Sequence, residues 1–244
     1  MAGDGTDVRS AVLDAARYLR GVRPLDPGEL CEYVPGGTTP GVVRAILRSN
    51  AYELRITECD DGQFVPVEDT TITPSFTGVD RFPARYESRM IELLSDQLGE
   101  EWFHDHAGDQ LREAIRQFKS AYFAGEDVAY DLETVLGYAI YHAPAYYATV
   151  QYVLHVLAAA GQLHSRLRIL DVGAGVGGPA LGVHDYLAET ATITYEAIEP
   201  SDATTILHPV LHETGPNFSA EVIRCPIESF VPEHEYDIIL FANV

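Results

Sequence analysis

The stretch LRILDVGAGVGG at residues 167–178 decides the fold of this 244-residue chain. Its first six residues are mostly apolar and end in Asp171-Val172, which is typical of a strand buried in a parallel sheet. Glycines fill most of the remaining positions, and Pro179 follows where a proline suits the first turn of a helix. Glycine permits positive φ and close approach, and a helix start offers unpaired N–H groups. The stretch therefore predicts a ligand site built from backbone at a strand-to-helix turn.

Strands and helices continue to alternate after this turn. Helices are expected at 178–187 and 203–212, and three further strands at 193–198, 220–224 and 236–242. This alternation predicts a parallel, Rossmann-like α/β sheet with right-handed crossovers. A complete domain of this type needs roughly three more strands, whereas the sequence ends at Val244. We expect residues 162–244 to be the first half of such a domain, incomplete at its C-terminal end.

Residues 1–69 have the order of a winged-helix module. Helices are predicted at 8–19 and 26–33, and Thr39-Pro40 opens a third. Two strands, 52–57 and 63–67, then flank the hairpin signal Asp60-Asp61-Gly62. Three helices followed by a hairpin predict a winged helix-turn-helix fold.

The third helix of this module is amphipathic. We expect four apolar side chains to face inward: Val42, Val43, Ile46 and Leu47. Arg44 and Arg48 lie four residues apart and share the outer face. They are candidates for phosphate contacts, and an ordinary solvated helix face is the alternative.

A second, helical region is predicted between the module and the sheet. A linker rich in Thr, Pro and Ser covers residues 70–83, and the helical region spans 84–161. Its helices are expected at 87–98, 109–123, 132–141 and 145–160. Pro144 stands near the start of the last helix and Gly161 ends it.

The charge balance is strongly acidic. The chain has 37 acidic and 16 basic residues, a formal net charge of −21, and Lys119 is its single lysine. Such self-repulsion is screened at high salt, so the composition favours adaptation to a salty cytoplasm. Residues 1–50 balance six arginines against six acidic residues. A nucleic-acid partner would need a local basic surface, and this segment is the only candidate.

Several classes of protein are disfavoured. We find no apolar run of the roughly 20 residues needed to cross a bilayer, and residues 1–7 lack the layout of a signal peptide. We therefore expect a cytoplasmic protein without a membrane partner. No metal site is predicted, because the cysteines are far apart and the histidines lack ligand spacing. These residues are Cys31, Cys59, Cys225, His104, His106, His142 and His155.

Two cofactors compete for the glycine turn, and a degenerate loop that binds neither is the third alternative. Gly173, Gly175 and Gly178 formally satisfy the dinucleotide pattern of a nicotinamide or flavin cofactor. Asp171 favours S-adenosylmethionine instead, because an anion at the strand end repels a pyrophosphate and suits a cationic methionyl group. Its predicted role is to accept hydrogen bonds from the turn or from the cofactor's ammonium, directly or through water. Gly177 belongs to the same turn.

Further candidates for cofactor binding follow the predicted strands. Glu199 and Pro200 end the second strand, and the two oxygens of Glu199 are placed to accept from both ribose hydroxyls. Glu228, with Ile227, follows the third strand and is a candidate for the adenine, with a plain surface loop as the alternative. Asn243 ends the fourth strand, where ligands of parallel sheets bind. No catalytic residue is predicted.

Residues 137–180 resemble the mitochondrial small-ribosomal-subunit methyltransferase-like family, whose archaeal and bacterial members include salt-loving ones. That family has a tyrosine-rich segment with an arginine, then Pro-Ala-Thr-Tyr-Ala, upstream of the glycine turn. Pro144-Ala145 and Tyr147-Ala148 match it. His142 stands in place of the arginine and Tyr146 in place of the threonine, so the resemblance assigns them no role.

The resemblance implies binding of S-adenosylmethionine near Asp171, Gly173, Gly175 and Glu199, and action on or with the small ribosomal subunit or its rRNA. We expect an S-adenosylmethionine-dependent methyltransferase that modifies rRNA or assists subunit assembly, with RNA approaching over the N-terminal helices. The alternative is a small-molecule O-methyltransferase that dimerises through its winged helix. A DNA-binding regulator is the third class considered.

Overall fold

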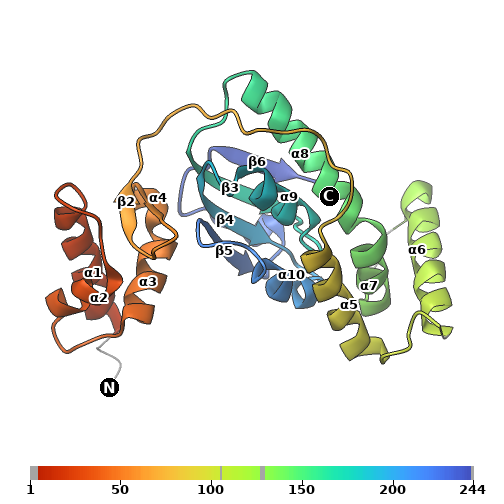
Figure 1. The fold of residues 1–244 in the computed structure, drawn as a ribbon. Helices are drawn as coiled ribbons and strands as arrows, with labels where there is room; N and C mark the ends of the chain where they lie inside the picture. The colour runs from red at the N-terminus through yellow and green to blue at the C-terminus, as the bar shows by residue number, and fades with distance from the viewer. Residues whose placement is uncertain (1–4, 105, 127–129, 243–244) are drawn as a thin grey trace.

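The computed structural model describes residues 5–104, 106–126 and 130–242, with side chains from Val8 onward. It is a mixed α/β molecule with an N-terminal module, a central parallel sheet and a group of helices beyond it (Figure 1). The predicted fold class is therefore confirmed.

The N-terminal module contains the predicted three helices and hairpin. Its elements are α1 (Gly5–Leu19), α2 (Pro27–Leu30), η1 (Cys31–Tyr33), α3 (Pro40–Ser49), α4 (Ala51–Leu54), β1 (Ile56–Glu58) and β2 (Phe64–Pro66). Asp26 caps α2 and Thr39 caps α3 through their side-chain oxygens. The strands pair antiparallel across a turn in which Gly62 has a φ of 80°.

Two details of the module differ from the prediction. The strand expected at 52–57 is helical at first, because Ala51 and Leu54, three residues apart, both enter the module's core. Arg55, with a φ of 51°, ends that helix, so the strand starts only at Ile56. Val42 is 46% exposed rather than buried, since Val43 and Leu47 alone occupy the inward row of α3.

The helical region comprises α5 (Ala84–Leu98), α6 (His106–Ala124), α7 (Leu132–Tyr141) and α8 (Ala143–Ala159). All four lie where the sequence predicts helices. The linker before them has no helix or strand, although Thr71 forms an isolated bridge to His164. Gly161, with a φ of 70°, follows the end of α8 as expected.

The sheet has four parallel strands in the order β5-β4-β3-β6. Its elements are β3 (Arg166–Val172), α9 (Gly178–Leu187), β4 (Thr192–Ile198), α10 (Thr204–Leu211), β5 (Phe218–Ile223), η2 (Ile227–Ser229) and β6 (Ile238–Phe241). Each predicted strand is present, with β5 starting two residues early and β6 shorter than expected. β3, the first strand of this sheet in chain order, lies inside the sheet, which is the arrangement of a doubly wound fold.

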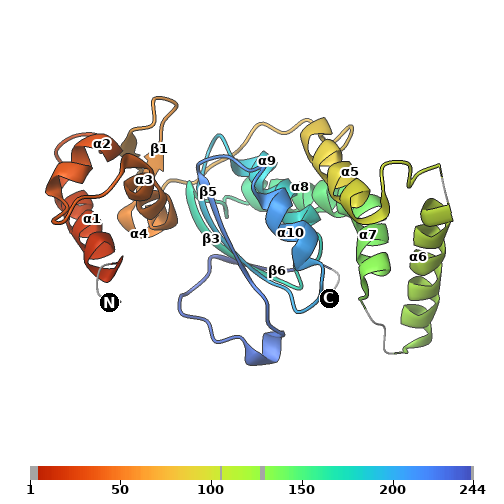
Figure 2. The same ribbon diagram turned by 90° about the horizontal axis from the view of Figure 1, so that it is seen from below.

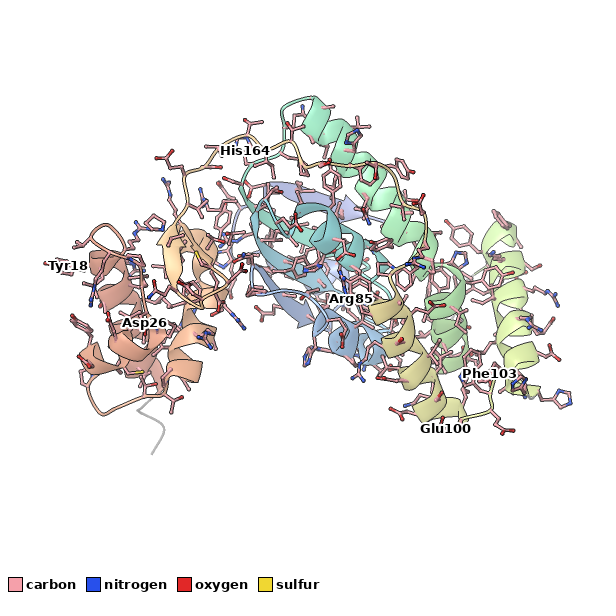
Figure 3. All side chains as sticks on the ribbon, in the orientation of Figure 1. Tyr18, Asp26, Arg85, Glu100, Phe103 and His164 are labelled. Carbon is pink, nitrogen blue, oxygen red and sulfur yellow. The ribbon has the colours of Figure 1, made fainter. Side chains whose placement is uncertain are left out.

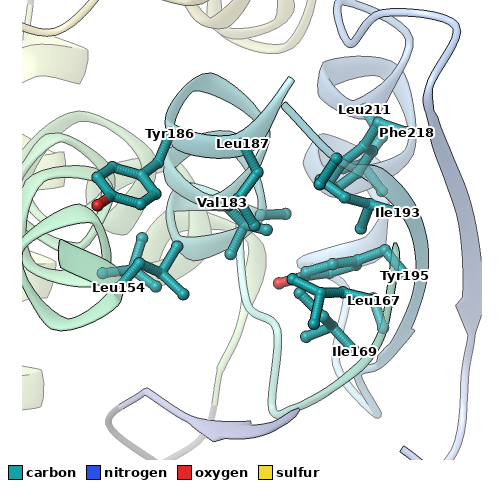
Figure 4. Packing of buried hydrophobic residues seen from close by; sticks show 14 of the residues in the cluster. Leu154, Leu167, Ile169, Val183, Tyr186, Leu187, Ile193, Tyr195, Leu211 and Phe218 are labelled. Atoms are coloured by element: carbon teal, nitrogen blue, oxygen red, sulfur yellow. The ribbon is translucent and has the colours of Figure 1, made fainter. Parts of the chain in front are cut away.

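One face of the sheet is covered by the helices that follow its strands. The main core gathers side chains from β3 and β4 against α8, α9 and α10 (Figure 4). Leu154, Val183 and Leu187 from the helices pack toward Ile169 and Ile193 from the strands. A second cluster joins α5 and α7 to α9 and α10, so the helical region shares a core with the sheet half.

The module and the helical region lie at opposite ends of the sheet (Figures 1 and 2). The module contacts the amino ends of the strands: the ring of Tyr52 lies 4.2 and 4.4 Å from the guanidinium carbons of Arg166 and Arg168. Asn217 also accepts from the backbone N–H of Glu58 at 2.9 Å. The glycine turn is at the carboxyl ends, on the side of α7 and α8.

Candidate cofactor site

The turn after β3 is held open by backbone geometry. Gly173, Gly175 and Gly177 have φ values of 67°, 56° and 89°, which favour glycine. The N–H groups of Gly173 and Ala174 both donate to the carbonyl of Ile198, at 2.9 and 3.2 Å. The end of β4 therefore fixes the path of the turn.

Glu199 is the carboxylate that faces this turn. It is 6% exposed, and its Oε2 accepts from the backbone N–H of Gly175 at 2.8 Å. Its Oε1 accepts from the N–H and the hydroxyl of Ser201, at 2.9 and 2.5 Å. Oε1 is therefore fully engaged by Ser201, whereas Oε2 keeps one further lone pair for an incoming donor. Glu199 therefore points into the predicted site while also bracing its wall.

A cavity of about 190 Å³ lies against the turn. It is lined by Tyr130, Val135, Tyr138, Tyr146, Gly173, Ala174, Gly175, Val176, Gly178, Pro179, Glu199, Pro200, Ser201, Ala203 and Ala242. Four predicted site residues, Gly173, Gly175, Glu199 and Pro200, are thus brought together. Glu199 is the single charged side chain among the described lining residues, so the cavity favours a cationic or neutral ligand.

Asp171 lies behind the turn rather than in the cavity. Along β3 it shares the face of Ile169, and it is fully buried beneath the helices. The Tyr195 hydroxyl donates to its Oδ2 at 2.6 Å, while Oδ1 has no hydrogen-bond partner among the described residues. Burial raises the pKa of Asp171 to about 7. A direct contact with the turn or with a bound ammonium is not what this geometry offers.

The remaining predicted residues differ in their placement. Gly177 caps α9, and a Cβ there would lie 2.9 Å from Leu207 Cδ1, so this glycine serves packing outside the cavity lining. Glu228 lies in η2 on an exposed loop and does not line the cavity, because the chain turns away after β5. Asn243 lies outside the described residues.

The arginines proposed for phosphate contacts are engaged within the module. Arg44 Nε lies 3.3 Å from Glu58 Oε1, and Arg48 Nε lies 2.5 Å from Glu58 Oε2. Both guanidinium groups are therefore partly neutralised by one nearly buried carboxylate. A phosphate would have to compete with that carboxylate for them.

Three tyrosines from the helical region complete the cavity and were not predicted. Tyr130 precedes α7, Tyr138 lies on α7 and Tyr146 lies in the first turns of α8. They are eight residues apart along the chain and come from a loop and two different helices. The tyrosine-rich composition around Pro144 was the only signal available for them.

Neither a metal site nor a membrane segment is found in the part of the chain that the structure describes. His, Cys, Asp and Glu side chains do not gather there in a group of three or more able to hold a metal ion. Within those same residues, every helix is too short or too polar to cross a membrane.

Comparison with known proteins gives a family match for the N-terminal module alone. Residues 9–60 match a family described as a domain of unknown function (DUF8157), N-terminal domain. No curated protein matches this sequence.

Solved structures similar to this chain include three methyltransferases. The S-adenosylmethionine-dependent methyltransferase SibL is 19% identical over 98% of this chain and 67% of its own, with a TM-score of 0.33. The CurJ carbon methyltransferase is 16% identical over 96% and 63%, with a TM-score of 0.33. The N,N-8-amino-8-demethyl-D-riboflavin dimethyltransferase RosA from Streptomyces davawensis is 13% identical over 98% and 68%, with a TM-score of 0.29.

The chain thus spans about two thirds of the length of these three proteins. Similarities with TM-scores this low do not determine a function, so the function rests on the site's own geometry.

Proposed function

We propose that this chain binds S-adenosylmethionine in the cavity at the glycine turn and belongs to a methyltransferase. The observation that carries the proposal is the lining of that cavity: glycine backbone on one side, and Glu199 as its single charged side chain among the described residues. A carboxylate at this position can accept from a ribose hydroxyl through the free lone pair of Oε2. The absence of a cation from that lining suits a ligand that is itself positively charged.

The same turn is less suited to a pyrophosphate. Dinucleotide sites use the free N–H groups at the start of the following helix. Pro179, in the first turn of α9, has no N–H to give. These features favour S-adenosylmethionine over a nicotinamide or flavin dinucleotide.

S-adenosylmethionine supplies an electrophilic methyl group, so an enzyme that uses it needs chiefly to align a nucleophile and exclude water. Glu199 would orient the ribose, and the turn would hold the cofactor through backbone contacts. Tyr130, Val135 and Tyr146 would close the cavity from the helical region. We assign no proton acceptor, because no histidine or second carboxylate lines the described part of the cavity.

For the methyl acceptor, the position of the module favours a small molecule. The N-terminal module lies at the amino ends of the strands, away from the cavity. Three of its arginines are also paired within the module: Arg44 and Arg48 lie beside Glu58, and Arg23 lies beside Glu29. Action on rRNA or with the small ribosomal subunit, the other candidate, and cytoplasmic localisation stay predictions.

Calorimetry in high salt tests the cofactor. We expect S-adenosylmethionine and S-adenosylhomocysteine to bind in the micromolar range, and NAD not to bind. Binding of NAD alone would overturn the assignment. A parallel titration with a small-subunit rRNA fragment tests the acceptor. Tight binding that weakens steeply with salt would favour rRNA, since phosphate contacts release counterions.

A further inference from the structure

Three tyrosines form one continuous wall of the cavity. We call Tyr130, Tyr138 and Tyr146 the tyrosine wall; all three line the cavity at the glycine turn. The Tyr130 and Tyr138 ring centroids are 6.0 Å apart. The charge of Glu199 contributes to raising the pKa of Tyr130, which places this ring within electrostatic reach of the carboxylate.

Neighbouring rings hold the wall in place. Phe118 of α6 contacts Tyr130 and Tyr138, with centroids 4.9 and 5.5 Å apart. The ring of His142 contacts both Tyr138 and Tyr146, with centroids 4.3 and 5.9 Å apart. The rings of the wall come from three successive parts of the chain and are held in place by Phe118 and His142.

The phenols of Tyr130 and Tyr146 stay neutral. Burial raises the pKa of Tyr130 and of Tyr146 well above the ordinary value, and their interactions with the neighbouring Tyr138 hydroxyl raise both pKa values further. Neutral tyrosines present electron-rich ring faces and oxygen lone pairs without a negative charge. Such surfaces attract cations whose charge is spread over several atoms.

The carboxylates near the turn are not free to pair with a positively charged group in the cavity. Oε1 of Glu199 accepts twice from Ser201 and Oε2 accepts once from Gly175, and a ribose hydroxyl would take the remaining lone pair of Oε2. Asp171 is fully buried outside the cavity, with Tyr195 as its donor. A positively charged sulfur in this cavity therefore lacks a free carboxylate among the described lining residues, and the aromatic rings are what remains.

Resting on the function proposed above, we infer that the tyrosine wall recognises the sulfonium charge of S-adenosylmethionine. The wall would distinguish this reactant from S-adenosylhomocysteine, whose sulfur is neutral. Cation–π attraction operates when a cation lies within about 6 Å of a ring centroid and strengthens where water is excluded. Polarised C–H groups beside the sulfonium would add weak contacts to the phenol oxygens. Favouring the charged reactant also favours release of the neutral product.

Affinity ratios test this inference without measuring turnover. We would titrate the chain with S-adenosylmethionine, with sinefungin, which carries an amine in place of the sulfonium, and with S-adenosylhomocysteine. In Tyr130→Leu and Tyr146→Leu, the preference for the two cationic ligands over S-adenosylhomocysteine should fall about tenfold. Tyr130→Phe keeps the ring and should keep most of the preference.

A matched control is available on α7. Tyr141 is 61% exposed and does not line the cavity, so Tyr141→Leu should leave all three affinities unchanged. Tyr130 is itself 39% exposed, so its replacement leaves the core intact and carries the test even if Tyr146→Leu fails to fold.

The two levels of the proposal fail in different ways. If the parent chain binds none of the three ligands, the proposed function is wrong and this inference falls with it. If the parent binds them all, and the leucine variants weaken them equally or not at all, the cofactor site stands. In that case the tyrosine wall does not distinguish the sulfonium charge from a neutral sulfur.

Discussion

Glu199 accepts a hydrogen bond from the backbone N–H of Gly175, with 2.8 Å between Oε2 and the nitrogen. The residue that follows β4 thus holds the turn that follows β3. The same side chain lines the cavity, so it couples the shape of the cradle to the proposed contact with the ribose. Its replacement should therefore affect both binding and local stability.

Replacing Glu199 should weaken cofactor binding strongly. In Glu199→Gln, the amide oxygen can still accept from one donor, but the NH₂ group faces donors of Gly175 or Ser201. Losing hydrogen bonds to a charged group costs about 1.5–3 kcal/mol, so we expect S-adenosylmethionine affinity to fall about 10- to 100-fold by calorimetry. Glu228→Gln is the control, because Glu228 is exposed and outside the cavity. Equal losses in both variants would remove the special role of Glu199.

The buried carboxyl of Asp171 should make stability depend on pH. Burial raises its pKa from 3.8 to about 7, so folding favours the protonated form. The stability that Asp171 contributes is fully present below about pH 4 and is lost as the pH rises through 7. The change amounts to roughly 4 kcal/mol for a shift of this size.

Asp171→Asn should abolish this part of the pH dependence. Urea unfolding at pH 5, 6, 7 and 8 would show the parent losing stability relative to the variant as the pH rises. The Asn side chain can still accept from the Tyr195 hydroxyl. Asp14→Asn is the control, because the Asp14 side chain is 70% exposed and should leave the parent curve unchanged. Parallel curves for the parent and Asp171→Asn would mean that the Asp171 carboxyl is ionised or solvated when folded.

The backbone part of the site was predictable, because it depends on local signals. A strand, a run of glycines and a proline in the first helical turn suffice to predict the turn, and Glu199 follows from strand-end position. The position of Asp171 near the end of its strand also made it a candidate. The alternation of side chains along β3, however, decides on which face of the sheet the Asp171 carboxyl lies. Asp171 shares the parity of Leu167 and Ile169, which face the helices, so it is buried behind the turn.

The side-chain wall was not predictable from local patterns. Tyr130, Tyr138 and Tyr146 meet because α7 and α8 fold over the carboxyl ends of the strands, which is a tertiary effect. The helix at Ala51–Leu54 was missed for a related reason. Its apolar spacing fits a short strand as well as a helical turn, and the module's core selects the helix.

Gly182 sets how closely α8 approaches α9. A Cβ at this position would lie 2.3 Å from Val150 Cγ1 and 2.4 Å from the carbonyl oxygen of Tyr147. Alanine gains about 1 kcal/mol in helix propensity over glycine, but the overlap with backbone would force the helices apart. We expect Gly182→Ala to lose about 3 kcal/mol, within the upper range for overpacking.

The melting temperature measures this effect. A loss of that size should lower it by about 6–12 °C in a chain of this length. Gly21→Ala is the matched control, because nothing lies within 4 Å of a Cβ at Gly21 and its φ is unstrained. If Gly182→Ala and Gly21→Ala have the same melting temperature, the contact between α8 and α9 accommodates the added methyl group.

Asp185 fastens α5 to the helices that cover the sheet. Its carboxylate accepts from the hydroxyls of Tyr86 and Tyr147, at 2.6 and 2.8 Å, and pairs with Arg85 at the start of α5 (Figure 3). His184 Nδ1 lies 2.7 Å from the same carboxylate. Although burial opposes ionisation, these donors together hold the pKa of Asp185 below its ordinary value. The carboxylate is therefore charged at neutral pH and central to the contact.

Removing this charge should loosen α5 from the sheet half. Asp185→Asn leaves Arg85 without its partner and weakens the bonds from two largely buried tyrosines, which we expect to cost about 2–4 kcal/mol. Because the folded pKa is lowered, the stabilisation is present above pH 4 and is lost as the pH falls through the lowered value. The difference between parent and variant should accordingly shrink in acid.

Limited proteolysis locates the change. The linker at residues 70–83 leads directly into α5, so cleavage there should speed up in Asp185→Asn at pH 7 while the module and the sheet fragment stay intact. Asp109→Asn provides the comparison, since the Asp109–Arg112 pair is 71% and 62% exposed and such pairs contribute little. Unchanged cleavage in Asp185→Asn would mean that the apolar contacts of Tyr86, Met90 and Leu94 hold α5 in place without the ionic contact.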